Sequence, residues 1–166
     1  MEYLVRRFVE NDWPDDNTEF SSIMEWKANS ITRGLRIENN VLSWWLIKDL
    51  DELTQIAISI ASVFKSSSRV FVIAVPYSDI EEQDIEIEFS DKDALTAVKH
   101  FRDRHYNLSN LSIGKLVKLA ELVALNARKS ENRKTVSFKD ILSEIKSLKE
   151  QEKLDIQLLG EAYNKI

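Results

Sequence analysis

The sequence contains no cysteine, only two histidines, two prolines and three glycines among its 166 residues. Without cysteine, the chain cannot form disulfides, thiolate zinc sites, iron–sulfur clusters or a cysteine nucleophile. Three isolated glycines provide neither a phosphate-binding loop nor a dinucleotide-binding fingerprint. No serine lies in the Gly-x-Ser-x-Gly context of a hydrolase nucleophile. The scarcity of glycine and proline predicts few loops and many helices.

The length and hydropathy of the chain predict a single domain. A chain of 166 residues can bury one real core and is too short for two domains of typical size. It has no run of 18 apolar residues that would cross a membrane, and its first residues lack the apolar stretch of a signal peptide. We therefore expect one domain over residues 1–166, located in the cytoplasm and without a membrane partner.

Charge is distributed unevenly along the chain, whose formal net charge is −5. Residues 1–90 carry 8 Lys and Arg against 17 Asp and Glu, a balance of −9. Residues 91–166 carry 15 against 11, a balance of +4. The two halves are therefore predicted to present fields of opposite sign, which bears on association more than on fold. Uneven scatter of charge in a small protein is the alternative explanation.

Strands are predicted mainly in the first half of the chain. Apolar runs and strict alternation indicate strands at residues 3–9, 70–75 and 84–90. Residues 35–47 have the pattern of a hairpin that turns at Asn39 and Asn40. In that hairpin one tryptophan, Trp44, points to one face of the sheet and the next, Trp45, to the other.

Helices are predicted throughout and dominate the second half. The first covers residues 16–32, with Asp16 and Glu19 at capping spacing, and the others cover residues 50–64, 94–105, 112–128 and 137–150, with a continuation toward residue 163. Residues 106–112 are expected to form a connector and residues 127–137 a basic loop. The order indicates an α+β fold with a mixed or antiparallel sheet of about five strands and flanking helices in residues 1–90, followed by a helical portion in residues 91–166.

Residues 14–27 resemble the signature of a large class of metal-dependent nucleases. Pro14-Asp15 is followed after nine residues by Glu25-Trp26-Lys27, which matches that pattern. In the nucleases, the acid and the lysine lie two apart on a strand and therefore share one face. Residues two apart on a helix face opposite ways, and residues 16–32 are predicted to be helical. The resemblance implies a catalytic set of Asp15, Glu25 and Lys27, but the predicted helix argues against it.

The two histidines do not have the spacing of a helical metal pair. His100 and His105 lie five residues apart, whereas two ligands on one helix face are four apart. We expect His105 at a helix end, where the helix dipole favours it, and His100 on the surface. The sequence thus predicts no metal site, no cofactor and no catalytic residue.

The densest charge pattern is an acidic run with no intervening lysine or arginine. It comprises Asp79, Glu81, Glu82, Asp84, Glu86, Glu88 and Asp91. Alternation places Ile85, Ile87 and Phe89 inward and three acids outward. There are two structural explanations. In the first, the strand lies at the edge of the sheet, where its charge prevents sheet-to-sheet aggregation; in the second, a neighbouring strand or helix supplies arginines that neutralise the acids. A docking surface for a basic partner and a divalent cation held by Asp84, Glu86 and Glu88 are the functional alternatives.

Basic residues gather in two places in the second half. Lys99, Arg102 and Arg104 are predicted on one helix, and Arg128, Lys129, Arg133 and Lys134 in one loop. Such clusters can bind phosphate backbones. Because the protein as a whole is acidic and helix C-termini favour basic residues without any ligand, we do not expect nucleic acid as the partner.

The leading functional hypothesis is a non-enzymatic interaction protein that docks a basic protein partner, such as a toxin, through its acidic strand. The predicted partner-binding residues are Glu82, Asp84, Glu86, Glu88 and Trp45, the last as an aromatic anchor if it is exposed. An immunity protein or antitoxin that blocks a basic nuclease is one concrete version. The alternatives are a metal-dependent nuclease that uses Asp15, Glu25 and Lys27, and a nucleic-acid-binding protein that uses the basic half.

Overall fold

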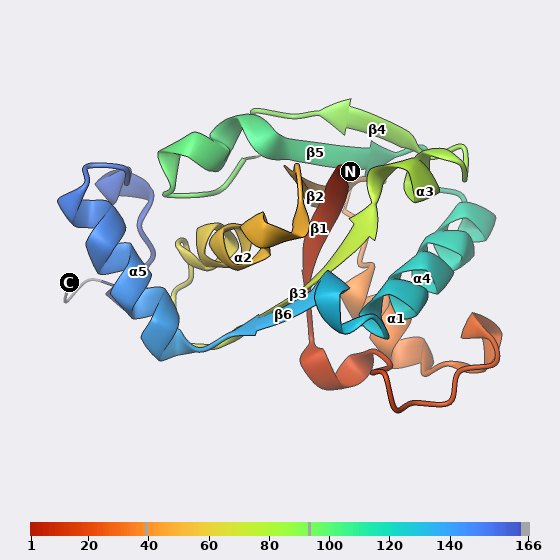
Figure 1. Ribbon diagram of the computed structural model, residues 1–166. Coiled ribbons are helices and arrows are strands. Elements are labelled where there is room, and N and C mark those ends of the chain that lie inside the picture. Colours follow the sequence, from red (N-terminus) through yellow and green to blue (C-terminus); the bar gives the residue numbers. More distant parts are fainter. Residues whose placement is uncertain (39, 93, 164–166) are drawn as a thin grey trace.

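An antiparallel sheet forms the centre of the protein, as the computed structural model in Figure 1 shows for residues 1–38, 40–92 and 94–163. Its strands within these residues are β1 (Tyr3–Phe8), β2 (Leu42–Ile47), β3 (Val70–Pro76), β4 (Glu86–Phe89), β5 (His105–Ser109) and β6 (Arg133–Val136). Their order across the sheet is β4-β5-β2-β1-β3-β6, and every neighbouring pair is antiparallel. The predicted α+β class is confirmed, and the sheet has six strands instead of about five.

Helices cover both faces of the sheet (Figure 1). One face is covered by α2 (Leu53–Ala61) and α5 (Phe138–Glu150), and the other by α1 (Ala28–Gly34), α3 (Tyr77–Glu81) and α4 (Ile113–Ala127). Short 3-10 helices occur at Glu10–Asp12, Ile23–Glu25, Leu50–Glu52, Lys99–Arg104, Ser130–Asn132, Ile156–Leu158 and Glu161–Tyr163. Because both faces are covered, β3 is buried at every residue, as its unbroken apolar sequence predicts.

The alternation predicted for the tryptophan pair is confirmed. Trp44 is fully buried against Leu4 and Phe8 on the α4 side of the sheet. Trp45 is 7% exposed and belongs to the core on the α2 and α5 side, with Ile47. Adjacent side chains on a strand point to opposite faces, so β2 contributes one indole to each half of the core.

The predicted hairpin at residues 35–47 is reduced to a single bridge between Glu38 and Val41. β5 occupies one side of Leu42–Trp45, whereas β1 pairs with β2 only at Trp45–Ile47. On the side away from β5, the Arg6 side chain donates to the Ser43 carbonyl at 2.6 Å and to the Gly34 carbonyl at 3.0 Å, so a β1 side chain takes a bond that a hairpin strand would otherwise make. Of the two predicted turn residues, Asn40 has a positive φ of 61°, and Asn39 lies outside the described residues.

The prediction that residues 91–166 are helical was wrong in two places. Residues 105–109, expected as a helix end and a connector, form β5 between β2 and β4. Residues 133–136, expected in a basic loop, form β6 on the edge beside β3. Strands from the second half therefore pair with strands from the first in one sheet. The predicted helix at 94–105 shortens to the 3-10 helix at Lys99–Arg104. In the sequence, Ser90 and Asp93 also have the spacing of a helix cap, but Asp93 lies outside the described residues.

The predicted helix at residues 16–32 was also wrong over its first half. Residues 16–22 are not helical, and the α-helix starts only at Ala28. Competing polar contacts explain the difference. The Asp15 carboxylate accepts hydrogen bonds from the Asn17 N–H and the Thr18 hydroxyl, which favours a turn. Asp16, expected as a helix cap, forms an ion pair with Arg133 at 2.6 Å.

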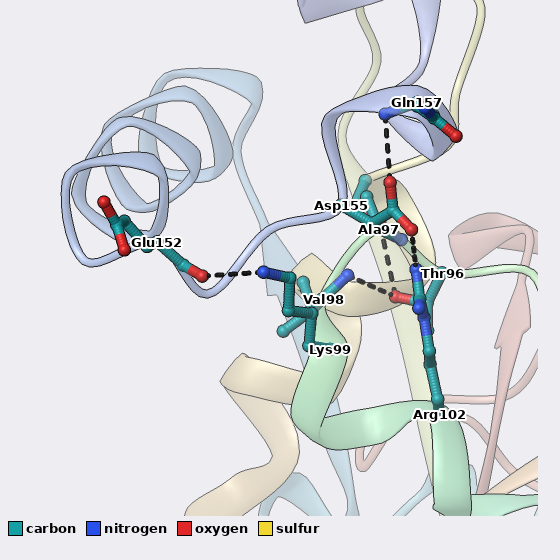
Figure 2. A network of polar contacts seen from close by, with 9 residues as sticks. Thr96, Ala97, Val98, Lys99, Arg102, Glu152, Asp155 and Gln157 are labelled. Atoms are coloured by element: carbon teal, nitrogen blue, oxygen red, sulfur yellow. Dashed lines mark hydrogen bonds and ion pairs between the residues drawn. The ribbon is translucent and has the colours of Figure 1, made fainter.

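A buried polar network holds the segment that leads into β5 (Figure 2). The Thr96 hydroxyl accepts the Val98 N–H at 3.1 Å and lies 2.7 Å from the Ser59 hydroxyl of α2. The chain after α5 then runs along this segment, where the Asp155 N–H donates to the Ala97 carbonyl at 2.8 Å. Arg102 secures the contact through its ion pair with Asp155 at 2.6 Å. These contacts fix the position of β5, on which β4 depends.

Candidate functional site

The acidic strand predicted at residues 84–90 is β4, and it lies at one edge of the sheet (Figure 1). Within the described residues it pairs with β5 alone, in a register that places Glu86 opposite Ser109 and Glu88 opposite Asn107. Both glutamates are exposed. We define the β4 edge as Glu82, Asp84 and residues 86–89. Of the structural explanations offered by the sequence, an edge strand is therefore the one observed.

The acids of the β4 edge differ in their contacts. Asp84, at the turn before the strand with a φ of 56°, forms an ion pair with Lys115 at 3.4 Å. The Glu86 carboxylate accepts hydrogen bonds from the Asn110 amide at 3.1 Å and the Ser109 hydroxyl at 3.3 Å. Glu88 makes no ion pair or side-chain hydrogen bond with any described residue. Neutralisation by neighbouring arginines, the other structural explanation, is thus absent among the described residues.

The side chains on the apolar side of β4 become more exposed to solvent toward the end of the strand. Ile85 is buried and Ile87 half-buried, as the alternation predicts. Phe89, also predicted to point inward, is 53% exposed. Its ring packs edge to face against Tyr106 of β5, at 5.7 Å between centroids. Phe89 is exposed because it stands on the outermost strand, beyond the reach of the helices that bury the central strands.

Trp45, predicted as a partner-binding anchor if exposed, lies in the core. Its ring packs edge to face against His105 at 4.9 Å, and only 7% of its surface is exposed. His105 itself is a buried residue of β5, where its Nδ1 lies 2.9 Å from the Ser90 carbonyl. His105 does follow the end of the 3-10 helix Lys99–Arg104, as predicted, but it also begins β5 and is buried, which the sequence did not predict. His100 lies on the surface, as predicted. Its partial desolvation is the larger cause of a lowered pKa, and the nearby Arg104 charge is the next.

The nuclease-like residues are only partly brought together. Asp15 and Lys27 both line an open cavity of about 790 Å³ beside Trp26 and Arg133. Glu25 is not among its lining residues and accepts a hydrogen bond from the Ser21 hydroxyl at 2.7 Å. Residues 22–28 form a 3-10 turn and the start of α1, not the strand on which the nuclease pattern depends. The described residues also contain no group of three acidic or histidine side chains placed to hold a metal ion.

Among the residues that line this cavity, Asp15 has a lowered pKa. The hydrogen bond from Thr18 lowers the pKa of its carboxyl, and the Arg133 charge lowers it further. Asp15 therefore stays ionised down to lower pH than an ordinary aspartate. A carboxylate with a lowered pKa is a weak general base, which does not favour acid–base chemistry at this position.

Several basic residues of the second half serve internal contacts. Arg104 forms an ion pair with Glu52 at 2.6 Å, and the Lys99 ammonium donates to the Glu152 carbonyl at 3.0 Å. Arg133 is held by Asp16. The Glu52 pKa is lowered overall, because the hydrogen bonds from Arg104 and from the Lys48 N–H outweigh the effect of burial. Sequence reasoning missed these pairings, since their members lie about 50 to 120 residues apart.

Comparison with family models, with curated proteins and with solved structures gives no match to this chain. Within the described residues, no helix has both the length and the apolar character that a membrane span needs.

Proposed function

We propose that this protein is a non-enzymatic interaction protein that docks a basic protein partner on the β4 edge. The observation that carries the proposal is the position of the acidic strand at the sheet edge, where Glu86 and Glu88 are exposed beside an exposed Phe89. Charge at such a place steers a basic partner, and an aromatic beside it supplies contact area. An immunity or antitoxin type of inhibitor that blocks a basic nuclease is one concrete version, because inhibition requires complementarity and no catalysis.

The cost of keeping these acids together supports a role beyond structure. Glu86 and Glu88 lie on the same face of one short strand, so their charges repel each other. Among the described residues no lysine or arginine forms an ion pair with either. Protection of the edge against aggregation is the structural role that acids can play here. The experiment below separates that role from docking.

The test compares three baits in lysate of the source cell, with the retained proteins quantified by mass spectrometry. The first bait is the wild-type protein, and the second carries Glu86→Lys and Glu88→Lys. The third carries Glu121→Lys and Glu150→Lys, which change the same amount of charge at exposed sites on α4 and α5. We expect a basic protein to be retained by the wild type and the α4/α5 variant and lost from the β4 variant.

Association kinetics then measure the electrostatic contribution with the purified partner. At an encounter distance of about 10 Å, reversing two charges should slow association about tenfold at low salt and about twofold at physiological salt. Equal association rates for the wild type and the β4 variant would show that the β4 edge is not part of the interface. Aggregation of the β4 variant without any loss of a partner would assign the acids to edge protection alone.

A further inference from the structure

The free side of β4 presents unpaired backbone groups, and their identity follows from the register. The Ser90 N–H donates to the His105 carbonyl at 2.9 Å, in line with the pairs of Glu88 with Asn107 and Glu86 with Ser109. In an antiparallel ladder, residues alternate between facing the partner strand and facing away from it. The backbone groups of Glu86 and Glu88 therefore point to β5, and those of Ile87 and Phe89 point away. No described residue bonds to these outward groups.

The side chains at this edge divide by face in the same alternation. Glu86 and Glu88 project from one face, together with Ser109 and Asn107 of β5. Ile87 and Phe89 project from the other face, where Phe89 meets Tyr106. The edge thus offers an acidic row, an apolar row and a line of free backbone donors and acceptors between them.

We infer that an extended segment of the partner joins the sheet as an antiparallel strand beside β4, with lysine or arginine alternating with apolar residues. This inference rests on the proposed function and states how the partner binds. Its apolar residues lie opposite Ile87 and Phe89 and exchange backbone hydrogen bonds with them. Its basic residues lie opposite Glu86 and Glu88 in non-hydrogen-bonded pairs, where cross-strand side chains come closest.

The same arrangement explains how an open edge can be selective. A free edge recruits any extended chain through its backbone, which is why exposed edges promote aggregation. Acidic side chains on this edge oppose a second copy of β4, because like charges directly opposite each other destabilise a strand pair. Basic side chains on an incoming strand reverse the sign of that interaction. The edge therefore admits a basic strand and excludes its own copies.

The test uses short peptides that alternate lysine and valine, titrated into the ¹⁵N-labelled protein and followed by NMR. One peptide is N-methylated at the valine amides, which in the antiparallel arrangement face β4. A second is N-methylated at the lysine amides, which face solvent, and so controls for the chemistry of methylation. We expect the valine-methylated peptide to bind at least tenfold more weakly than the lysine-methylated one, since it loses its backbone donors. Equal affinities, or the reverse order, would overturn antiparallel strand addition.

A matched pair of variants tests the same contact from the protein side. Phe89→Ala removes the ring, and Phe89→Pro removes both the ring and the outward N–H. Neither substitution touches the backbone hydrogen bonds between β4 and β5, because the N–H and C=O of Phe89 point away from β5, and edge strands tolerate proline. We expect the proline variant to bind the unmethylated peptide several-fold more weakly than the alanine variant. Equal binding by the two variants would contradict a hydrogen bond from the Phe89 N–H.

The Glu86→Lys and Glu88→Lys variant distinguishes this inference from the proposed function. If the peptide binds the wild type and this variant equally, acidic docking fails and strand addition to an acidic edge fails with it. If binding depends on the glutamates but not on which amides are methylated, the acidic surface still docks a basic chain and only strand addition is refuted. Shifts of the Ile87 and Phe89 amides that exceed those of Glu86 and Glu88 would support both.

Discussion

Replacing Thr96 by valine should destabilise the fold strongly, although the two side chains differ only in one hydroxyl group and one methyl group. Thr96 is fully buried, and valine has nearly the same shape, so the substitution isolates the hydroxyl. That hydroxyl accepts the Val98 N–H at 3.1 Å and lies 2.7 Å from the Ser59 hydroxyl (Figure 2 shows the Val98 bond). It also donates to the Ser59 carbonyl at 3.0 Å. Valine would leave two buried polar groups, the Val98 N–H and the Ser59 hydroxyl, without these bonds.

The expected magnitude follows from the number of orphaned groups. A buried donor or acceptor left unsatisfied costs about 1–3 kcal/mol, so two of them cost about 2–6 kcal/mol in the free energy of unfolding. Folded domains are stable by only about 5–15 kcal/mol, so the loss is a large part of the total. The Ser62 hydroxyl should be less affected, because it still donates to the Ser59 carbonyl at 2.7 Å and accepts the Ala97 N–H at 2.9 Å.

Urea unfolding followed by tryptophan fluorescence measures the change in the free energy of unfolding. The matched control is Thr96→Ser, which keeps the hydroxyl and removes one buried methyl, at a cost of about 1 kcal/mol. Because the network holds the segment before β5, the valine variant should also loosen the contact of Ala97 with Asp155. If Thr96→Val costs no more than Thr96→Ser, the hydroxyl network does not stabilise this segment and the reasoning is wrong.

The remaining predictions concern the segment after α5. Gly160→Ala should lower the thermal midpoint sharply, because a Cβ at this position would collide with the Phe64 backbone. Gly114→Ala on α4 places its Cβ in ordinary contact with the Ser112 hydroxyl, at 3.9 Å, and should be neutral or slightly stabilising. A similar effect of the two changes in a thermal melt would contradict the packing described here. The Arg102 hydrogen bond lowers the Asp155 pKa, so the stability it contributes is present above about pH 4 and is lost as pH falls through the lowered value. Asp155→Asn should therefore be less stable than the wild type at pH 7, and urea titrations should show the difference shrinking below pH 4; a constant difference would rule out this linkage.

Strands with a clear side-chain pattern could be predicted from the sequence, and strands defined by their partners could not. β3 is apolar throughout and β2 alternates its tryptophans, and both patterns record burial between helices. β5 and β6 are short and rich in polar residues, with sequences HYNLS and RKTV. They are strands because β2, β4 and β3 offer them hydrogen bonds, and such non-local pairing leaves little trace in the local sequence.

Burial was predicted better than conformation. The apolar face assigned to a helix at 94–105 does enter the core, since Ala97, Val98 and Phe101 are all buried. The backbone there is irregular up to Val98 and then 3-10, because Thr96 and the chain near Asp155 supply hydrogen bonds that a helix would otherwise make internally. For the candidate site, the acidic alternation predicted a strand with exposed acids, but its place at the edge depended on β5, which the sequence did not reveal.

Part of the charge asymmetry between the two halves of the sequence is neutralised by ion pairs within the fold. Basic residues of the second half pair with acids of the first in Arg104–Glu52, Lys115–Asp84 and Arg133–Asp16. The opposing electrostatic fields predicted for the two halves therefore partly cancel, because acids of the first half pair with bases of the second. Glu86 and Glu88 make no such pair with any described residue, so the acidity relevant to docking is local. The β4 variant and the α4/α5 variant proposed above each replace two glutamates by lysine, which changes the net charge of −5 by +4 to −1. A difference in association between them would thus reflect where the charge lies, because their net charges are equal.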